Sequence, residues 1–232
     1  MKLRQRLHHT QHIPRHRHIQ PYAAVVLAGG YMEAGDHGRW RVSAGDVLIH
    51  APFSSHMDRV TTAKTEVLNL SLSMQHAHLG GYWQLADPDV LVTLAEKDPT
   101  QARQALLQQI QPGNLGESDP VDQLARQLKL ANPPAISEWA AQNGLRRETV
   151  FRQFQSAYGI NPTQYRVEAR SHQAWYQIVS SALSLADIAA NLGFADQAHM
   201  SRAIKRISGF SPGYWRNLPQ LQHSFKNLVT AP

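Results

Sequence analysis

The stretch LADIAANLGFADQAHMSRAIKR, residues 185–206, decides the fold of the C-terminal part of this 232-residue chain. Its apolar residues Leu185, Ile188 and Leu192 recur at the spacing of one helix face. Gly193 follows them, and glycine suits the left-handed position at which many helices end. The stretch therefore predicts a helix that stops at a tight turn.

A second helix is predicted directly after this turn. Asp196 is a good N-cap for a helix from Gln197 to about Ser208, and Gly209 follows as a stop. Ser211-Pro212 then combines a capping serine with a proline in the first turn, which indicates a further helix start. Helix, tight turn and helix together predict a helix-turn-helix unit.

The same plan occurs once more upstream. Residues 136–166 align with residues 185–216 at an offset of 49, which becomes 50 after one inserted residue. The identical pairs are Ala140/Ala189, Ala141/Ala190, Gly144/Gly193, Arg152/Arg202, Gly159/Gly209, Pro162/Pro212 and Arg166/Arg216. The first copy predicts helices at Ile136–Gln142 and from about Arg147 to Tyr158. A plain helical bundle is the alternative, but a bundle does not require two copies with the same alanine pair and turn glycine.

A long helix from Pro162 to about Ser180 is predicted between the two copies. At 1.5 Å per residue it spans roughly 25–30 Å. This is about the scale needed to place two recognition helices one DNA turn apart, roughly 34 Å. Two helix-turn-helix units in one chain could therefore bind two DNA half-sites, as a symmetric dimer of single units does.

Residues 185–206, followed by GFSPGYWR at 209–216, resemble the signature of the AraC/XylS family, and the first copy resembles it more loosely. The resemblance covers roughly residues 117–218. It implies DNA binding with base contacts from Glu148, Arg152, Gln197 and Arg202. Arg146 departs from the pattern, because the family usually has a serine or another small capping residue there; this weakens the local cap and adds charge near the DNA.

The exposed faces of the two predicted recognition helices supply the candidate DNA-binding residues, since base edges are read by such faces. They are Arg146, Arg147, Glu148, Thr149, Arg152 and Gln153 in the first copy, and Gln197, Ala198, His199, Ser201, Arg202, Lys205 and Arg206 in the second. The apolar positions Val150, Phe154, Met200, Ala203 and Ile204 are expected in the core.

Charge is distributed unevenly along the chain. The net charge is +6, residues 21–132 hold eight basic and twelve acidic residues, and residues 133–218 hold nine basic and five acidic ones. A basic C-terminal third suits contact with DNA phosphates. Charge alone is equally consistent with an ordinary solvated surface. There is no cysteine, so disulfides and thiolate metal sites are excluded. The N-terminal residues lack a signal-peptide core and no apolar run is long enough to span a membrane, which predicts a cytoplasmic protein.

The N-terminal part is predicted to be rich in strands over residues 13–72. PRHRH (residues 14–18) and GDVLIHAPFSSH (residues 45–56) resemble the two motifs of the cupin barrel. The fold class is therefore expected to be α+β: a small N-terminal cupin-like β-barrel, followed by an all-α domain with two helix-turn-helix units joined by a long helix.

The cupin resemblance places His16, His18 and His56 at metal-ligand positions, with Tyr22 or Ala23 at the spacing of the usual glutamate. Imidazoles two residues apart on a strand point to the same side, which suits a shared ligand. Three readings stay open: a small-molecule pocket formed by His16, His18, Tyr22 and His56; a divalent metal held by the three histidines; and surface histidines without a role. His8, His9 and His12 are expected in a polar tail, and His76 and His78 on the surface.

Four segments are expected along the chain: a ligand-sensing domain at 1–84, a helical connector and linker at 85–116, the DNA-binding domain at 117–218, and a tail at 219–232. Apolar stripes in the connector, such as Val90/Leu91/Leu94 and Leu106/Leu107/Ile110, could form a dimer interface or pack against the barrel.

Together these features predict a transcription regulator rather than an enzyme, one that binds operator DNA and responds to a small molecule. A second copy of the chain and RNA polymerase are candidate partners, and a membrane is not. Two alternatives remain: a metal-dependent cupin enzyme with an appended DNA module, and an architectural DNA-binder without an effector.

Overall fold

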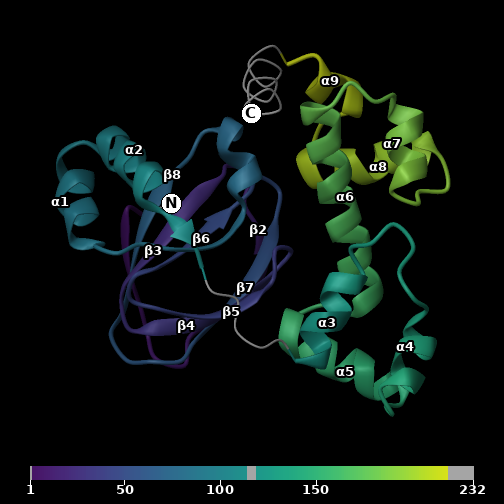
Figure 1. The fold of residues 1–232 in the computed structure, drawn as a ribbon, viewed down its shortest axis with the longest axis horizontal. Helices are drawn as coiled ribbons and strands as arrows, with labels where there is room; N and C mark the ends of the chain where they lie inside the picture. The colour runs from purple at the N-terminus through teal and green to yellow at the C-terminus, as the bar shows by residue number, and fades with distance from the viewer. Residues whose placement is uncertain (1, 114–118, 219–232) are drawn as a thin grey trace. The chain divides into compact units, whose positions relative to one another are not determined.

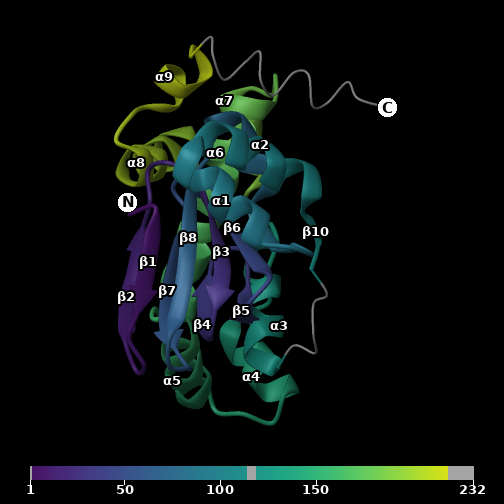
Figure 2. The same cartoon turned by 90° about the vertical axis from the view of Figure 1, so that its left-hand side faces the viewer.

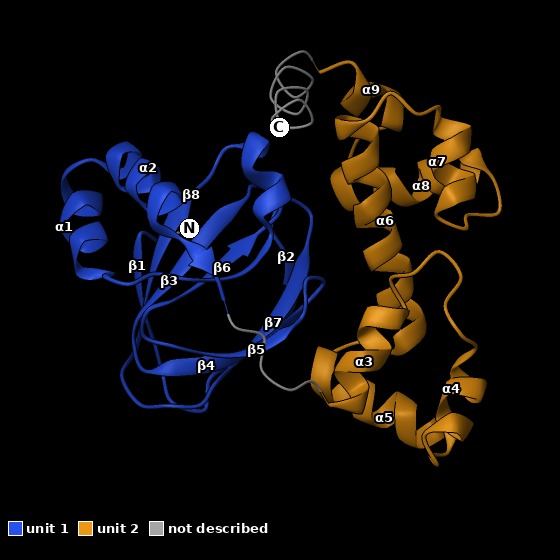
Figure 3. Cartoon of the chain, viewed as in Figure 1, with its two compact units in different colours: residues 1–118 blue, residues 119–232 orange. Residues whose placement is uncertain are grey.

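The computed structural model describes residues 2–113 and 119–218 of the chain. The chain divides into two compact units, residues 1–118 and residues 119–232 (Figures 1 and 3). The first unit is rich in strands and the second is helical, as the sequence predicts. No helix in the described ranges is both long and apolar enough to cross a membrane.

Unit 1 consists mainly of antiparallel strands in two sheets. One has six strands in the order β1-β8-β3-β6-β9-β10, and the other has four in the order β2-β7-β4-β5. The strands are β1 (Arg4–Leu7), β2 (His12–Arg17), β3 (Tyr22–Ala28), β4 (Gly30–Gly35), β5 (Arg39–Ser43), β6 (Asp46–His50), β7 (Ser55–Val60), β8 (Thr65–Ser71), β9 (Gly81–Gln84) and β10 (Gln111–Pro112). A 3-10 helix, η1, spans Met74–Leu79.

The prediction of a closed barrel is wrong for the strands that the structure describes. They pair into two separate open sheets, in which β2 and β5 each pair on one side only. The sheets are joined by side chains instead: Tyr31 and Val42 of the small sheet pack in one cluster with Val26 of the large sheet. Unit 1 is therefore a two-layer β-structure with its interior between the sheets.

The six-stranded sheet is buried on both faces, which explains why β3 (YAAVVLA) lacks polar alternation. Tyr22, Ala24 and Val26 face the small sheet, whereas Ala23 and Val25 belong to a second cluster on the opposite face. Helices α1 (Asp89–Lys97) and α2 (Pro99–Gln109) cover that opposite face (Figure 2).

Helices α1 and α2 form the predicted connector, and their contacts show what the apolar residues on their inner faces pack against. Leu91, Ala95, Ala102 and Leu106 are buried in the same cluster as strand residues such as Leu68. These residues pack against the sheet, so the helices belong to unit 1. Val90 is 47% exposed and lies outside this buried set.

Two further expectations, both about histidines of unit 1, need correction. The region around His8, His9 and His12 is no polar tail, because β1 pairs with β8 and β2 pairs with β7. Arg4 of β1 forms a 2.7 Å ion pair with Glu66 of β8, which adds a side-chain contact at this edge. His78 is exposed as expected, but His76 is half-buried in η1.

Unit 2 contains seven described helices. They are α3 (Pro120–Gln127), α4 (Ile136–Gln142), α5 (Arg147–Tyr158), α6 (Pro162–Ser180), α7 (Leu185–Asn191), α8 (Gln197–Ser208) and α9 (Pro212–Arg216). The sequence predicts all of these helices except α3, which lies within the expected DNA-binding domain, residues 117–218. The predicted tail, residues 219–232, lies outside the described residues.

Helix α6 is the centre of unit 2 and is roughly 28 Å long at 1.5 Å per residue. Asn161 caps its first turn through the backbone N–H of Gln164. Tyr165, near its start, packs edge-on against Phe154 of α5, and Trp175, near its end, packs edge-on against Trp215 of α9. One helix thus supports one helix-turn-helix copy at each end.

Candidate functional site

The second helix-turn-helix copy, α7 and α8, is held at both helix starts. The Ser184 hydroxyl accepts a hydrogen bond from the Asp187 backbone N–H at 3.0 Å, and the Asp196 carboxylate accepts one from the His199 backbone N–H at 2.6 Å. Gly193 turns the chain between the helices at φ +69°, a conformation that glycine adopts without steric cost. Each helix thus has a capped first turn, and a glycine turn joins the two.

The first copy, α4 and α5, has the same turn. The Leu145 backbone N–H donates to the Ala140 carbonyl at 2.8 Å, and the equivalent Phe194 N–H donates to the Ala189 carbonyl at 2.9 Å. Gly144 has φ +66°, close to that of Gly193. The sequence repeat is therefore a repeat of backbone geometry.

Side chains on the recognition helices divide into a buried and an exposed face. The predicted core residues Val150, Phe154, Met200, Ala203 and Ile204 are all buried. The candidates that are exposed are Arg146, Arg147, Glu148, Arg152, Gln153, Gln197, Ala198, Arg202, Lys205 and Arg206. Thr149, His199 and Ser201 are half-buried and present less surface to a ligand.

All charged side chains on the exposed face of α8 are cationic. Arg202, Lys205 and Arg206 lie on it, and the helix contains no acidic residue. On α5, Arg152 shares the exposed surface with Glu148, and the Arg147 guanidinium lies 4.5 Å above the Phe151 ring. Exposed arginines on a helix face can pair with guanine edges or with phosphates.

A second cluster of polar groups lies inside unit 1. His16 of β2 and His56 of β7 are register partners, and their Nε2 atoms are 3.1 Å apart. The His18 ring lies 4.7 Å from that of His16, centroid to centroid, and its Nε2 lies 3.4 Å from the Tyr22 hydroxyl. The structure thus brings together all four residues that the sequence predicts for a ligand pocket.

Three residues in this cluster were not predicted: Glu33 of β4, His50 of β6 and Asp58 of β7. Glu33 and Asp58 are register partners and their carboxyl groups share a hydrogen bond. The His50 Nε2 lies 3.6 Å from a Glu33 carboxylate oxygen. Strand period could have indicated His50, because it lies two residues after Leu48, an interior residue of the same strand.

Burial and like charge shift the pKa values of these groups. Burial raises the pKa of Glu33 well above its ordinary range, and Asp58 opposite adds to the shift; burial also raises the pKa of Asp58 to about 7. Burial lowers the pKa of His50 and His56 well below the ordinary value, and partial burial together with His16 lowers the pKa of His18 to about 4. The imidazoles of His18, His50 and His56 are therefore neutral at pH 7, the form that binds metals.

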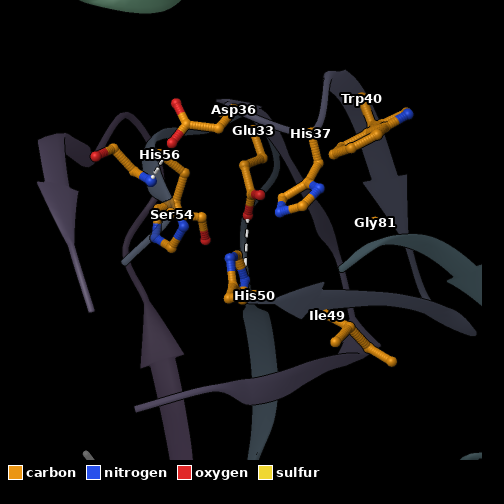
Figure 4. Close-up of a pocket in the computed structure, with 11 residues that line it drawn as sticks. Glu33, Asp36, His37, Trp40, Ile49, His50, Ser54, His56 and Gly81 are labelled. Carbon is orange, nitrogen blue, oxygen red and sulfur yellow. Dashed lines mark hydrogen bonds and ion pairs between the residues drawn. The ribbon is translucent and has the colours of Figure 1, made fainter. Parts of the chain in front are cut away.

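A small pocket opens beside this cluster (Figure 4). Glu33, His50 and His56 line it together with Asp36, His37 and Trp40. On one side of the pocket, Asp36 accepts a 2.8 Å hydrogen bond from the Ser55 N–H and pairs with Arg15. Its cavity volume is about 10 Å³, which is about the space needed for one water molecule. In this conformation the pocket admits a water molecule or an ion, and not an organic molecule of several heavy atoms.

Comparisons with known proteins bear on the C-terminal unit. Residues 139–218 match a family described as a helix-turn-helix domain. The HTH-type transcriptional activator RhaR of Escherichia coli (strain K12) is 29% identical over 98 residues, which is 42% of this chain and 34% of RhaR. The chain thus spans about a third of the length of this curated relative.

Solved structures add neighbours at low overall similarity. The DNA-binding domain of AdpA, solved with a target DNA, is 29% identical and covers 43% of this chain and 91% of its own, with a TM-score of 0.39. ToxT from Vibrio cholerae is 8% identical and covers 93% of this chain and 98% of its own, with a TM-score of 0.43. Because both TM-scores are below 0.5, the assignment of the C-terminal unit rests on the sequence matches and the repeat geometry.

The duplicated turn, the buried and exposed faces and the sequence match define the class of unit 2, which is a tandem helix-turn-helix domain. More narrowly, residues 139–218 match a helix-turn-helix domain family and are similar in sequence to part of the transcriptional activator RhaR.

Proposed function

We propose that this protein is a sequence-specific DNA-binding transcription regulator that acts on double-stranded operator DNA in the cytoplasm. The observation that carries the proposal is the duplicated unit itself: two recognition helices with the same turn geometry, each with exposed arginine on its outer face. RhaR, which is similar in sequence to this domain, is named a transcriptional activator.

Direct base reading is assigned to Glu148 and Arg152 in the first copy and to Gln197 and Arg202 in the second. Glutamine suits adenine, arginine suits guanine and glutamate suits the amino group of cytosine. The remaining exposed cations, such as Lys205 and Arg206, contact phosphates and set the register. Residues 117–218 form the DNA-binding part in this proposal.

Unit 1 is the sensor in this proposal. Its two facing sheets accord with a cupin-like fold, since cupins are double-sheet structures. Its polar interior cluster is the binding site for a small effector. An organic effector would need a conformation with a wider cavity than the present one of about 10 Å³, and binding to that conformation shifts the population of DNA-competent states. A second copy of the chain, paired through exposed residues of α1 such as Val90, and RNA polymerase are the further partners.

The enzyme alternative receives less support from the geometry. A cupin enzyme needs room for an organic substrate beside its metal, whereas the pocket at Glu33 and His56 holds about 10 Å³. An ion that regulates DNA binding fits this space better than a substrate that must react in it.

Selection of bound sequences from a random double-stranded DNA pool with the full chain tests the proposed function. We expect a recurring site with two short conserved segments about 10 base pairs apart, one for each recognition helix. Binding to that site should fall steeply with salt, because Lys and Arg contacts to phosphate release counterions. A pool that remains random after several rounds would contradict sequence-specific binding.

A further inference from the structure

Three buried side chains from three strands converge between the sheets of unit 1. Glu33 comes from β4, His50 from β6 and His56 from β7, and each is at most 5% exposed. One potential ligand atom from each lies within 4.8 Å of the others (Figure 4). Since β6 belongs to the large sheet and β4 and β7 to the small one, the cluster bridges the two sheets.

The spacing within the cluster suits a bound transition metal. Two ligands of a tetrahedral ion, each about 2.0–2.1 Å from the metal, lie roughly 3.4 Å apart. The distance from His50 Nε2 to a Glu33 carboxylate oxygen is 3.6 Å, which is close to this separation, and a ligand atom of His56 lies within 4.8 Å of both.

Charge balance distinguishes this cluster from the three histidines that the cupin motif indicates. His16, His18 and His56 are neutral ligands, and Asp58, whose Oδ2 lies 3.9 Å from His56 Nε2, would leave one positive charge of a dication among them uncompensated. Glu33 and its register partner Asp58 supply two carboxyl groups at the same place. The two carboxyl groups together would neutralise a dication bound between them.

Unpaired polar atoms at the cluster also indicate a missing partner. His56 Nδ1 and Asp58 Oδ1 are buried and have no hydrogen-bond partner among the described residues. Buried polar atoms are nearly always paired, and an orphaned one calls for an ion, a water molecule or another explanation. Metal-bound histidines usually use one ring nitrogen for the metal and hold the other in a hydrogen bond, and His56 Nε2 already has His16 as such a partner.

We propose that the interior of unit 1 binds one divalent transition-metal ion through Glu33, His50 and His56, with Asp58 as the balancing carboxyl group. Glu33 thus supplies, from β4, the carboxylate that the cupin motif lacks at Tyr22 and Ala23. Imidazole with carboxylate suits Zn²⁺ and its neighbours in the first transition row rather than Mg²⁺ or Ca²⁺. This site stands on the geometry of unit 1 and is tested without DNA, so it holds or fails separately from the proposed function.

The test is metal binding by the full chain, produced without a histidine tag and dialysed against a chelator. Equilibrium dialysis with Zn²⁺ should give one ion per chain, and Co²⁺ should give the visible absorption bands of a four- or five-coordinate site. Glu33→Gln keeps the shape of the side chain and removes its charge, and we expect at least about a tenfold loss of Zn²⁺ affinity. His50→Gln should cause a loss of similar size.

The matched control replaces exposed histidines outside the cluster. A variant with His8→Ala, His9→Ala and His12→Ala together should bind Zn²⁺ as the unchanged chain does. Zn²⁺ should raise the thermal midpoint of the unchanged chain and of this control, because an ion that binds only the folded state stabilises it. It should not raise the midpoint of Glu33→Gln, whose far-ultraviolet circular dichroism serves as the fold control.

Two results would overturn the proposal. The first is no stoichiometric Zn²⁺ or Co²⁺ binding by the unchanged chain. The second is unchanged affinity in a folded Glu33→Gln variant together with loss of binding in His18→Ala, which would assign the metal to His16, His18 and His56 instead.

Discussion

The two helix-turn-helix copies share their turns and differ in how their helices begin. In the second copy, Ser184 and Asp196 cap α7 and α8. In the first, Ala135 and Arg146 occupy the same positions, and neither makes a side-chain capping bond to α4 or α5. The difference teaches that the turn and the buried face suffice to build the motif, and that caps are added stability.

The second turn also has tertiary contacts that the first turn lacks among the contacts described. In the second copy the Gly193 carbonyl accepts a hydrogen bond from Arg170 of α6, and the Arg170 guanidinium lies 4.3 Å above the Phe194 ring. In the first copy, support comes from the far end of α5, where the Tyr158 hydroxyl donates to Asp122 of α3 at 2.8 Å. The start of α8 is therefore held more firmly than the start of α5.

The largest effects are expected at the two equivalent arginines. Arg202→Ala and Arg152→Ala should each weaken binding to the selected operator by about 1–3 kcal/mol, roughly 5- to 150-fold. We expect the larger loss at Arg202, because Asp196 fixes the first turn of its helix. Fluorescence anisotropy titrations on operator and random DNA measure both losses, with the exposed Arg41→Ala of unit 1 as control. An equal loss on random DNA would show phosphate contact without base reading.

A smaller effect is expected at the two turn glycines. Both have positive φ, so alanine strains the backbone by about 1 kcal/mol at Gly144. At Gly193 a Cβ would also lie 3.1 Å from the Ala131 carbonyl oxygen, whereas at Gly144 it meets nothing within 4 Å. The loss at Gly193 should therefore reach about 2 kcal/mol. Denaturant unfolding, followed by the helical circular dichroism signal, compares the stabilities of the two variants. Equal losses of stability would mean that the Ala131 backbone moves away from the added methyl group without cost.

The capping positions should separate the two copies by about 1 kcal/mol. Asp196→Ala removes the bond to the His199 N–H and should destabilise unit 2 by about that amount. Arg146→Ala removes no capping bond and should change stability by less than about 0.5 kcal/mol. The same unfolding measurement applies, and a loss at Arg146 as large as that at Asp196 would contradict the difference in capping.

The smallest effect is a gain. Arg146→Ser restores a capping side chain at the start of α5 and should stabilise unit 2 by about 0.5 kcal/mol. Loss of the positive charge should at the same time reduce the salt dependence of DNA binding by about one counterion. Thermal unfolding and anisotropy at two salt concentrations measure the two changes. A destabilised variant would mean that Arg146 makes a contact worth more than the cap.

The helices of unit 2 could be predicted nearly to the residue because local signals mark their ends. Asp196 and Ser211 begin helices, and Gly159 and Gly209 end them with φ of +74° and +81°. The exception is α3, which was not predicted although it begins with the cap Asp119 and Pro120. Its place is fixed by packing of Leu124 and by the bond from Tyr158, which local sequence does not show.

The interior cluster of unit 1 could be predicted only in part. The cupin-like motifs indicate His16, His18 and His56, but β4 and β7 carry polar residues that point inward, so they break the alternation by which strands are recognised. Glu33 and Asp58 meet only through the register of those two strands. Positions that violate local patterns in this way are often functional sites.

The most direct test of the central claim is a hydroxyl-radical and base-methylation footprint of the full chain on its selected operator. Each copy should protect its own major-groove segment, the two segments lying about 10 base pairs apart on one face of the duplex. Arg152→Ala should remove base protection from one segment only, and Arg202→Ala from the other. A single protected segment that responds to Arg202→Ala and ignores Arg152→Ala would contradict the account in which both copies read DNA.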